Sequence, residues 1–380
     1  MKIKVNTASW KKAVKKALSL AGTNSGNPKE TCIGINIKEG NSYLQVLESG
    51  VHNTTIQLED ITIEEEGACY LQHNSLKNLD SQAITLKEFE VSLLNNNLIY
   101  SVVGFGAISE PIFHDQNPFQ GMTFETDNYT LLEEGNTPFI KLLSSGVKSF
   151  SDVVEDKSKS TISVVLNKEN SIMAGVLSNS SATGLVYNFT SEATADFTIK
   201  TELIKKVSFL FDDESTVKVE KGNNTLKVTS SKGESLLSIS KGNEIATTYL
   251  SNSFKLEADS SVLLEADNLK AIAKWQSYGN EDGGCISIYS EEDKLLVKGD
   301  KTQEASSIDY GESNPFNLVK LPTELLLGAV NVMPKDSPLT FKVTVQNVAN
   351  FDHPIKTALL IHEEDDYTST AYLSEPAVRN

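Results

Sequence analysis

The sequence predicts an α+β protein made of three similar domains, each an antiparallel sheet with two helices. Helical patterns recur along the chain at intervals of about 130 residues. Alternating apolar residues separated by turn residues fill the intervals between these patterns, as in antiparallel strands. A chain of 380 residues is also too long for one ordinary hydrophobic core. The expected domains are residues 1–125, 126–254 and 255–380.

The first helix of each domain is marked by its starting residues. We expect these helices at Ala8–Leu20, Pro138–Phe150 and Ala266–Tyr278. Thr7 and Thr137 precede the first two and are predicted N-caps, while Asp267 takes the capping role in the third. Pro138 stands at the first helical position, where its missing N–H costs nothing.

A second, shorter helix follows in each domain. These helices are expected at His73–Ser81, Lys200–Leu210 and Pro322–Lys335. Ser75, Thr201 and Thr323 each occupy the hydroxyl position that caps a helix start. Because both sets of helices repeat at nearly the same interval, the sequence predicts an internal repeat rather than chance similarity.

The strands are expected between the helices. Predicted strand segments are Ile33–Val46, Val91–Val102, Ile162–Val176, Val217–Ile239, Ile286–Val297, Phe341–Val345 and Thr357–His362. Turn residues such as Glu39-Gly40-Asn41 and Asn95-Asn96-Asn97 divide them into hairpins. Residues 115–136 and 241–261 are the expected linkers, too poor in Gly and Ser to act as flexible tethers.

The composition excludes several classes of protein. No apolar run approaches the ~20 residues that span a bilayer, and the N-terminus lacks a signal-peptide core, so we expect a cytoplasmic location. The chain has three widely spaced cysteines with no CxxC pair, which favours structural thiols. The five histidines lack metal-ligand spacing and are expected on the surface or in turns. No catalytic motif is present, so we expect neither an enzyme nor a cofactor or metal.

Positive charge collects on the predicted helices. The chain has a net charge of -17, yet the first helix holds four lysines and no acid. Lysine is a good helix former and is common on any solvated helix face, but glutamate is equally good and acids outnumber bases 51 to 34. Four of the six predicted helices nevertheless carry more lysine than acid. The pattern favours a local basic face directed at a polyanion.

The whole chain resembles a known family. Its opening strand Met1–Val5 leads into a helix, its three domains repeat, and its final segment Thr370–Pro376 forms a last strand before the tail. In these features the chain resembles the bacterial β sliding clamp, the processivity subunit of the replicative DNA polymerase, or a phage version of it. The resemblance implies three sliding-clamp domains arranged as half of a ring.

The resemblance also implies a function and partners. It implies a head-to-tail homodimer that encircles double-stranded DNA without sequence specificity, is loaded by a clamp loader and tethers the replicative DNA polymerase. The expected DNA-facing residues are Lys11, Lys12, Lys15, Lys16, Lys77, Lys141, Lys148, Lys205, Lys206, Lys270 and Lys274. Two alternatives remain: a processivity factor that binds DNA as a monomer, and a β-rich structural or virion protein.

Two further surfaces follow from the resemblance. The dimer interface is expected around Phe105, Ile108 and Trp275. A groove for partner peptides, between the second and third domains, is expected to include Leu177, Leu185, Leu250, Leu325, Tyr372, Leu373 and Pro376. The chain departs from the family here, because Ser180–Leu185 lacks the family's His-Arg pair and Glu375 and Ala377 replace the usual tail methionines.

Overall fold

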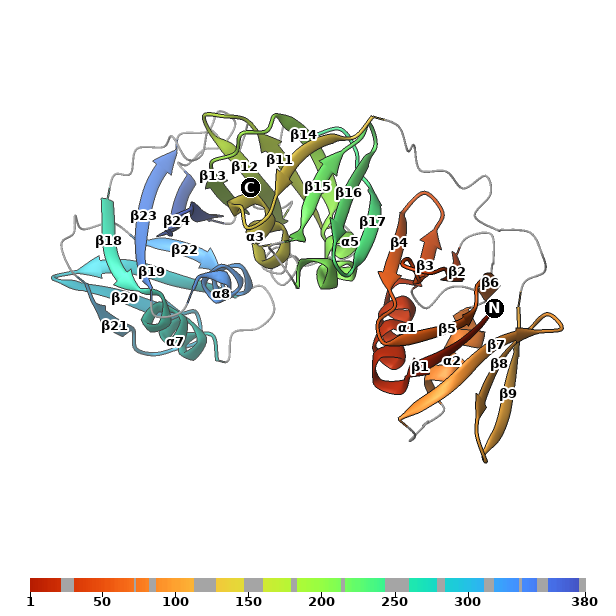
Figure 1. The fold of residues 1–380 in the computed structure, drawn as a ribbon. Coiled ribbons are helices and arrows are strands. Elements are labelled where there is room, and N and C mark those ends of the chain that lie inside the picture. Colours follow the sequence, from red (N-terminus) through yellow and green to blue (C-terminus); the bar gives the residue numbers. More distant parts are fainter. Residues whose placement is uncertain are drawn as a thin grey trace. The chain divides into compact units, whose positions relative to one another are not determined.

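A computed structural model describes the protein as two compact units. The described residues are 1–21, 31–71, 73–81, 87–112, 128–146, 160–178, 183–212, 216–242, 260–278, 284–310, 318–334, 337–346 and 355–375. Unit 1 comprises Met1–Ile140 and Leu203–Ile239, and unit 2 comprises Lys141–Glu202 and Ser240–Asn380. Each unit therefore joins segments that are far apart in the sequence, and each contains two sheets (Figure 1).

Sheet A of unit 1 is antiparallel, with the strand order β5-β1-β7-β8-β9. Its strands are Ile61–Glu65 (β5), Lys2–Asn6 (β1), Glu88–Leu94 (β7), Asn97–Val102 (β8) and Gly106–Pro111 (β9). Asn95 and Asn96 turn the chain between β7 and β8 with φ angles of 50° and 59°, which asparagine tolerates better than most residues. β9 forms one edge of the sheet.

Sheet B of unit 1 has eight strands in the order β10-β15-β16-β17-β4-β3-β2-β6. The strands are Thr130–Glu134 (β10), Lys218–Lys221 (β15), Thr225–Ser230 (β16), Gly233–Ser238 (β17), His52–Gln57 (β4), Tyr43–Glu48 (β3), Thr31–Ile37 (β2) and Gly67–Leu71 (β6). The antiparallel pairing of β17 with β4 sets Ser235 opposite Thr54. We call this pairing the unit 1 seam, because it joins distant parts of the chain.

Helices α1 (Thr7–Ala21) and α2 (His73–Ser81) belong to unit 1 and contact each other. α1 contacts β1 of sheet A and β2, β3 and β4 of sheet B, so it lies between the two sheets. Trp10 of α1 meets Phe89 and Tyr100 of sheet A edge-on, with ring centroids 6.1 and 6.3 Å apart. These contacts fix the orientation of α1 on sheet A.

Sheet C of unit 2 has eight strands in the order β14-β11-β12-β13-β25-β24-β23-β18. The strands are Ala195–Lys200 (β14), Thr161–Leu166 (β11), Ser171–Ser178 (β12), Thr183–Phe189 (β13), Tyr367–Ser374 (β25), Ile355–Glu363 (β24), Pro338–Gln346 (β23) and Ser260–Glu265 (β18). The pairing of β13 with β25, which sets Leu185 opposite Ala371, is the unit 2 seam.

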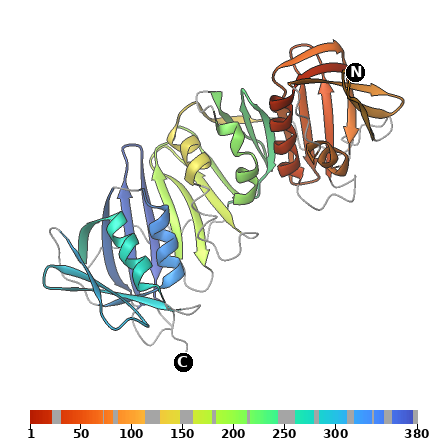
Figure 2. The same ribbon diagram turned by 90° about the horizontal axis from the view of Figure 1, so that it is seen from below.

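Sheet D of unit 2 has four strands in the order β21-β20-β19-β22. They are Ser306–Asp309 (β21), Lys294–Gly299 (β20), Cys285–Glu291 (β19) and Val319–Pro322 (β22). Helices α7 (Ala266–Gln276) and α8 (Thr323–Val332) lie side by side and contact strands of both sheets C and D (Figure 2). Unit 2 thus places a helix pair between two sheets, as unit 1 does.

Most sequence-predicted elements are confirmed, but two kinds of boundary are wrong. The hairpins and the helices at 73–81, 266–276 and 323–332 lie where expected. The predicted helix from Pro138 is a single turn, α3 (Pro138–Lys141), continued by a π-type turn at Leu142–Gly146; residues 147–150 lie outside the described chain. Similarly, α5 (Thr201–Lys206) gives way to a 3-10 turn at Ser208–Phe211. Strand β10 falls within the first predicted linker, and β18 begins in the last two residues of the second.

The predicted helix caps are mostly wrong. Asn6, not Thr7, caps α1, because its Oδ1 accepts the N–H groups of Ala8 and Ser9 at 2.9 and 3.2 Å. Thr137 is confirmed, since its hydroxyl accepts the Ile140 N–H at 3.4 Å. Ser75 lies inside α2 and Asp267 inside α7, so neither is a cap.

The hydroxyls of Thr201 and Thr323 donate to backbone carbonyls outside their own helices. The backbone N–H and the hydroxyl of Thr201 both donate to the Ser160 carbonyl, at 3.1 and 3.2 Å. The same two groups of Thr323 both donate to the Gly284 carbonyl, at 2.9 and 2.8 Å. Each threonine therefore ties the start of a helix to the residue that precedes a neighbouring strand.

Candidate nucleic-acid interface

Helix α1 has one apolar face and one basic face. Its buried residues are Thr7, Trp10, Ala13, Val14, Ala17, Leu20 and Ala21, spaced as one face of a helix requires. Lys12 and Lys15 are exposed, and Lys11 and Lys16 are half-buried at the border of the two faces. Burial of the apolar face therefore turns the lysines away from the core of unit 1.

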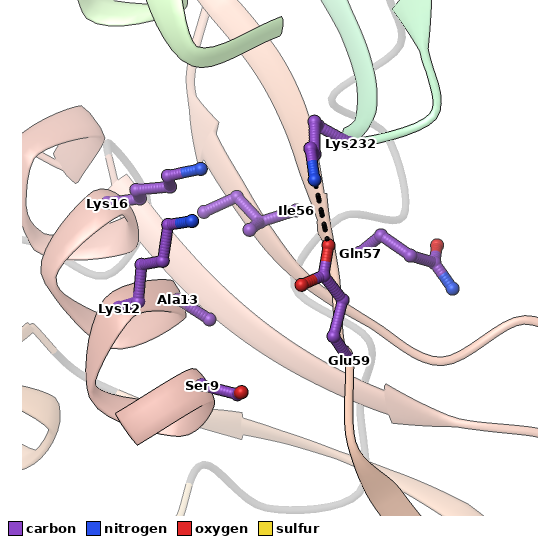
Figure 3. Close-up of a pocket in the computed structure, with 8 residues that line it drawn as sticks. All are labelled: Ser9, Lys12, Ala13, Lys16, Ile56, Gln57, Glu59 and Lys232. Atoms are coloured by element: carbon purple, nitrogen blue, oxygen red, sulfur yellow. Dashed lines mark hydrogen bonds and ion pairs between the residues drawn. The ribbon is translucent and has the colours of Figure 1, made fainter. Parts of the chain in front are cut away.

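Lys12 and Lys16 share a hollow with a lysine from another part of the chain (Figure 3). Lys232, in the turn between β16 and β17, lines the same hollow. Its ammonium group pairs with the Glu59 carboxylate at 3.2 Å. Neither Lys232 nor Glu59 belongs to a predicted helix, so counting charge on helices could not have found them.

The other predicted DNA-facing lysines of unit 1 lie in mixed surroundings. Lys77 is exposed on α2. Lys205 and Lys206 are half-buried at the end of α5, and the Lys206 ammonium lies 3.6 Å from the Glu48 carboxylate. Part of the predicted positive charge in unit 1 is thus neutralised by the protein itself.

Unit 2 neutralises one of its predicted lysines more fully. The Lys141 ammonium forms an ion pair with Asp366 at 2.9 Å. Lys270 is half-buried and Lys274 exposed on α7, while Lys148 lies outside the described residues.

Exposed apolar side chains mark the predicted interface residues. Phe105 is 79% exposed in the turn between β8 and β9, next to a fully exposed Val103, and Ile108 is partly exposed on β9. Trp275 is 66% exposed at the end of α7 and packs edge-on against Tyr278, which is 64% exposed. Contiguous exposed apolar groups of this kind are typical of protein interfaces.

The predicted peptide-groove residues lie in the core of unit 2. Leu185, Leu325, Tyr372 and Leu373 are each 5% exposed or less. Tyr372 and Leu373 are neighbours on β25, so their side chains point to opposite faces of sheet C and cannot line one groove together. Leu177 lies in β12, while Leu250 and Pro376 lie outside the described residues.

The cysteines and histidines are not arranged for chemistry in the described part of the chain. Burial raises the pKa of the Cys32 and Cys69 thiols to about 12, which keeps them protonated and unreactive. Among the described residues, no three His, Cys, Asp or Glu side chains gather as a metal site requires. The prediction of surface histidines is wrong for His52 and His362, which are 0% and 4% exposed.

No helix within the described ranges is long and apolar enough to cross a membrane.

The complete fold is that of the bacterial DNA polymerase sliding clamps. The beta subunit from DNA polymerase of Streptococcus pyogenes superposes with a TM-score of 0.76 at 16% identity, over 100% of both chains. The DNA polymerase sliding clamp from Bacillus subtilis gives a TM-score of 0.78 at 11% identity, over 100% of this chain and 99% of that chain. The Helicobacter pylori beta clamp bound to a DNA ligase peptide gives 0.76 at 12% identity, over 98% and 99%.

No protein-family model and no curated protein sequence matches the chain. At such low identity, what the chain shares with these clamps is its fold.

Proposed function

We propose that the protein is a DNA polymerase processivity factor, a non-enzymatic sliding clamp that encircles duplex DNA without sequence specificity. The observation that carries this proposal is the similarity of fold over the full length of both chains. Encirclement requires a basic surface toward the DNA backbone rather than a catalytic site, and α1 supplies such a surface in an acidic protein. The replicative polymerase and a clamp loader are the proposed partners, in the cytoplasm of a bacterial or phage-infected cell.

Repetition in the sheets supports a division into three domains near residues 125 and 255. The strand orders β1-β7-β8-β9, β10-β15-β16-β17 and β18-β23-β24-β25 follow one pattern, and β6-β2-β3-β4, β14-β11-β12-β13 and β22-β19-β20-β21 follow a second. The matching hydrogen bonds of Thr201 and Thr323 add a repeated detail. Under this division sheets B and C each contain strands of two domains, so the compact units do not follow the domain boundaries.

The same pattern supports a head-to-tail homodimer, half of the ring coming from each copy. At each seam the last strand of the first pattern pairs with the last strand of the second, β17 with β4 and β25 with β13. β9 and β21 are the remaining last strands, and both lie at sheet edges. Pairing β9 of one copy with β21 of another repeats the seam and closes after two copies.

Exposed apolar residues lie beside both edges. Phe105 directly precedes β9. Trp275 adjoins Gln276, whose side-chain amide donates to the Ser306 hydroxyl of β21 at 2.7 Å. A contact that buries these aromatic groups is expected to contribute much of the association energy.

Solution mass tests the dimer. The native protein is expected at twice the 41.5 kDa chain mass, and Phe105→Ser at the mass of one chain. Leu263→Ser is the matched control, because Leu263 is also an exposed apolar residue, 51% exposed, and lies on β18 of sheet C rather than on sheet A or sheet D. A native monomer that still stimulates polymerase would instead favour a monomeric processivity factor.

Retention on circular DNA tests encirclement. A loaded ring is expected to remain on closed circular DNA at salt concentrations that remove electrostatic binders, and to leave once a single cut linearises the circle. Retention that survives the cut would contradict encirclement. No retention and no polymerase stimulation would favour a structural or virion protein.

We also propose that partner peptides bind unit 2 near β25 and α8, as expected from the sequence. The Helicobacter pylori clamp of similar fold is bound to a DNA ligase peptide. The groove residues that the structure describes are buried. Such a peptide would therefore first contact the exposed residues that surround them. Competition between a polymerase-derived peptide and intact polymerase would test this site.

A further inference from the structure

The hollow beside α1 in unit 1 combines groups from three parts of the chain. Ser9, Lys12 and Lys16 come from α1, Glu59 follows β4, and Lys232 precedes β17. The hollow is shallow and open to solvent, with a volume of about 30 Å³. The ammonium groups of Lys12 and Lys16 extend from the helix toward the side on which Lys232 lies (Figure 3).

The unit 1 seam fixes Lys232 in this position. The Lys232 carbonyl accepts the Gln57 N–H at 2.9 Å, which continues the pairing of β17 with β4. The next residue, Gly233, has φ +144°, and a Cβ atom there would lie 2.1 Å from the Thr55 carbonyl oxygen. Only glycine permits so close an approach, so the fold holds Lys232 beside the helix.

The hollow carries uncompensated positive charge. Glu59 neutralises Lys232. Within the described part of the chain, neither Lys12 nor Lys16 forms an ion pair, although Asp212 lies near enough to favour the charge on Lys16. Ser9 is engaged elsewhere, since its hydroxyl donates to the Asp60 carboxylate at 2.6 Å.

The surroundings of Lys16 make that charge costly for the protein alone. Its side chain is half-buried, and the cation–π contact of its ammonium with the Phe209 ring, 4.5 Å from the ring centre, offsets only part of the lost hydration. Burial and the charge of Lys12 lower the pKa of Lys16. A bound anion would offset both effects, because it replaces lost hydration and shields the two ammonium groups from each other.

We propose that this hollow binds one backbone phosphate of the encircled duplex, held by Lys12, Lys16 and Lys232, with Glu59 restraining its affinity. The proposal rests on the proposed function and locates a phosphate contact on it. Lysine binds phosphate as a point charge without reading bases, which suits a protein that slides. A backbone phosphate is favoured over a free anion because Lys15 extends the positive face along α1 beyond the hollow.

The test measures binding of the full chain to a short linear duplex across a salt series. Lys12→Gln with Lys16→Gln is expected to weaken binding by about tenfold and to reduce the salt slope by about 0.9, the contribution of one phosphate. Lys38→Gln is the control, an exposed lysine of unit 1 that lies outside both α1 and the hollow, and is expected to leave the slope unchanged. A reduction of the slope by Lys38→Gln as large as that of the double variant would overturn the proposal.

Glu59→Gln is expected to change the affinity for duplex DNA in the opposite direction. It frees Lys232 for the phosphate and is expected to tighten duplex binding by roughly threefold, an effect that Lys12→Gln with Lys16→Gln should remove. Unchanged binding by Glu59→Gln would contradict the restraining role. Native affinity in the double variant would overturn the phosphate site.

Two further measurements distinguish a failure of the phosphate site from a failure of the proposed function. Inorganic phosphate, titrated by calorimetry, is expected to bind only weakly; tight binding that the double variant abolishes, with duplex binding unchanged, would assign the hollow to a free anion. Retention of loaded clamp on circular DNA reports encirclement independently of the hollow. If retention is normal while the salt slopes do not differ, the phosphate site is wrong and the proposed function stands.

Discussion

The two seams perform the same structural task with different chemistry. The unit 1 seam buries a polar chain in which His52, Thr54 and Ser235 are all 0% exposed. The unit 2 seam buries Leu185, Val186 and Ala371 and stacks Tyr187 edge-on against Tyr367 at 5.8 Å. One seam depends on completed hydrogen bonds and the other on close packing, so the same kind of strand pairing responds to different perturbations.

The hydrogen bonds of the unit 1 seam form one directed chain. The His52 Nε2–H donates to the Leu20 carbonyl at the end of α1, at 3.2 Å. Nδ1 must then accept the Thr54 hydroxyl at 3.2 Å, and Thr54 in turn accepts the Ser235 hydroxyl at 2.7 Å. The chain links the end of a helix, β4 and β17.

Truncation in the unit 2 seam is expected to have the largest effect. Leu185→Ala should lower the free energy of unfolding by about 2–5 kcal/mol, because it leaves a cavity at a fully buried position of β13. Leu185→Met, which nearly conserves volume, should cost less than about 1.5 kcal/mol. Denaturant unfolding of both variants measures the difference. A small loss in Leu185→Ala would show that Leu185 faces an open groove rather than core.

Removing the central hydroxyl of the unit 1 seam is expected to rank second. Thr54→Val keeps the shape but leaves His52 Nδ1 and the Ser235 hydroxyl unpaired, at about 1–3 kcal/mol for each buried group. Ser235→Ala, which leaves the Thr54–His52 bond intact, should cost only about 1 kcal/mol. If the two variants unfold at the same denaturant concentration, the chain does not act as a unit.

Acid should weaken the unit 1 seam and not the unit 2 seam. Burial lowers the pKa of His52 from 6.5, an effect opposed by the Leu20 carbonyl and Glu48 and aided by Lys206. Above pH 6.5 His52 is neutral in both states. Below it the unfolded chain binds a proton that the folded chain refuses, so stability falls by up to about 1.4 kcal/mol per pH unit until the folded pKa is reached.

Hydrogen exchange of the β4 and β17 amides between pH 7 and pH 5 measures this effect, after correction for intrinsic exchange rates. Amides of β13 and β25 provide the internal control. Equal losses of protection at both seams would exclude His52 as the cause.

The ion pair at the end of the unit 1 seam is expected to matter least for stability. Lys232→Gln breaks an exposed pair with Glu59 and should change the free energy of unfolding by less than about 0.5 kcal/mol. Thermal unfolding measures it. A larger loss would indicate that Lys232 supports the fold rather than a ligand.

Local features were predictable from the sequence, and distant pairings were not. Hairpins such as the one at Asn95-Asn96 follow from the residues in the turn itself. The seams join residues such as Thr54 and Ser235, 181 positions apart, and no local pattern specifies their register. The cap predicted at Thr7 is wrong because Asn6 accepts the first N–H groups of α1. The hydroxyls of Thr201 and Thr323 donate to carbonyls that precede neighbouring strands, and no local pattern predicts these acceptors.

The same limit applies to the sites. Lys12 and Lys16 were predictable because four lysines on one helix of an acidic chain are conspicuous. Lys232 and Glu59 were not, because only the unit 1 seam brings them to α1. Apolar residues such as Leu185 and Tyr372 fit a core and a groove equally well by type, and only their burial distinguishes the two.

The long separation in sequence between β4 and β17 also determines when the unit 1 seam can form during synthesis. β4 is complete after residue 57, but its partner β17 begins at Gly233. At roughly 5–20 residues per second, the ribosome needs about 10–40 s to supply that partner. During this interval the nascent chain presents β4 as an open edge, the kind of strand that pairs with foreign chains. Nascent chains whose synthesis is arrested between β4 and β17 are therefore expected to depend most on chaperones.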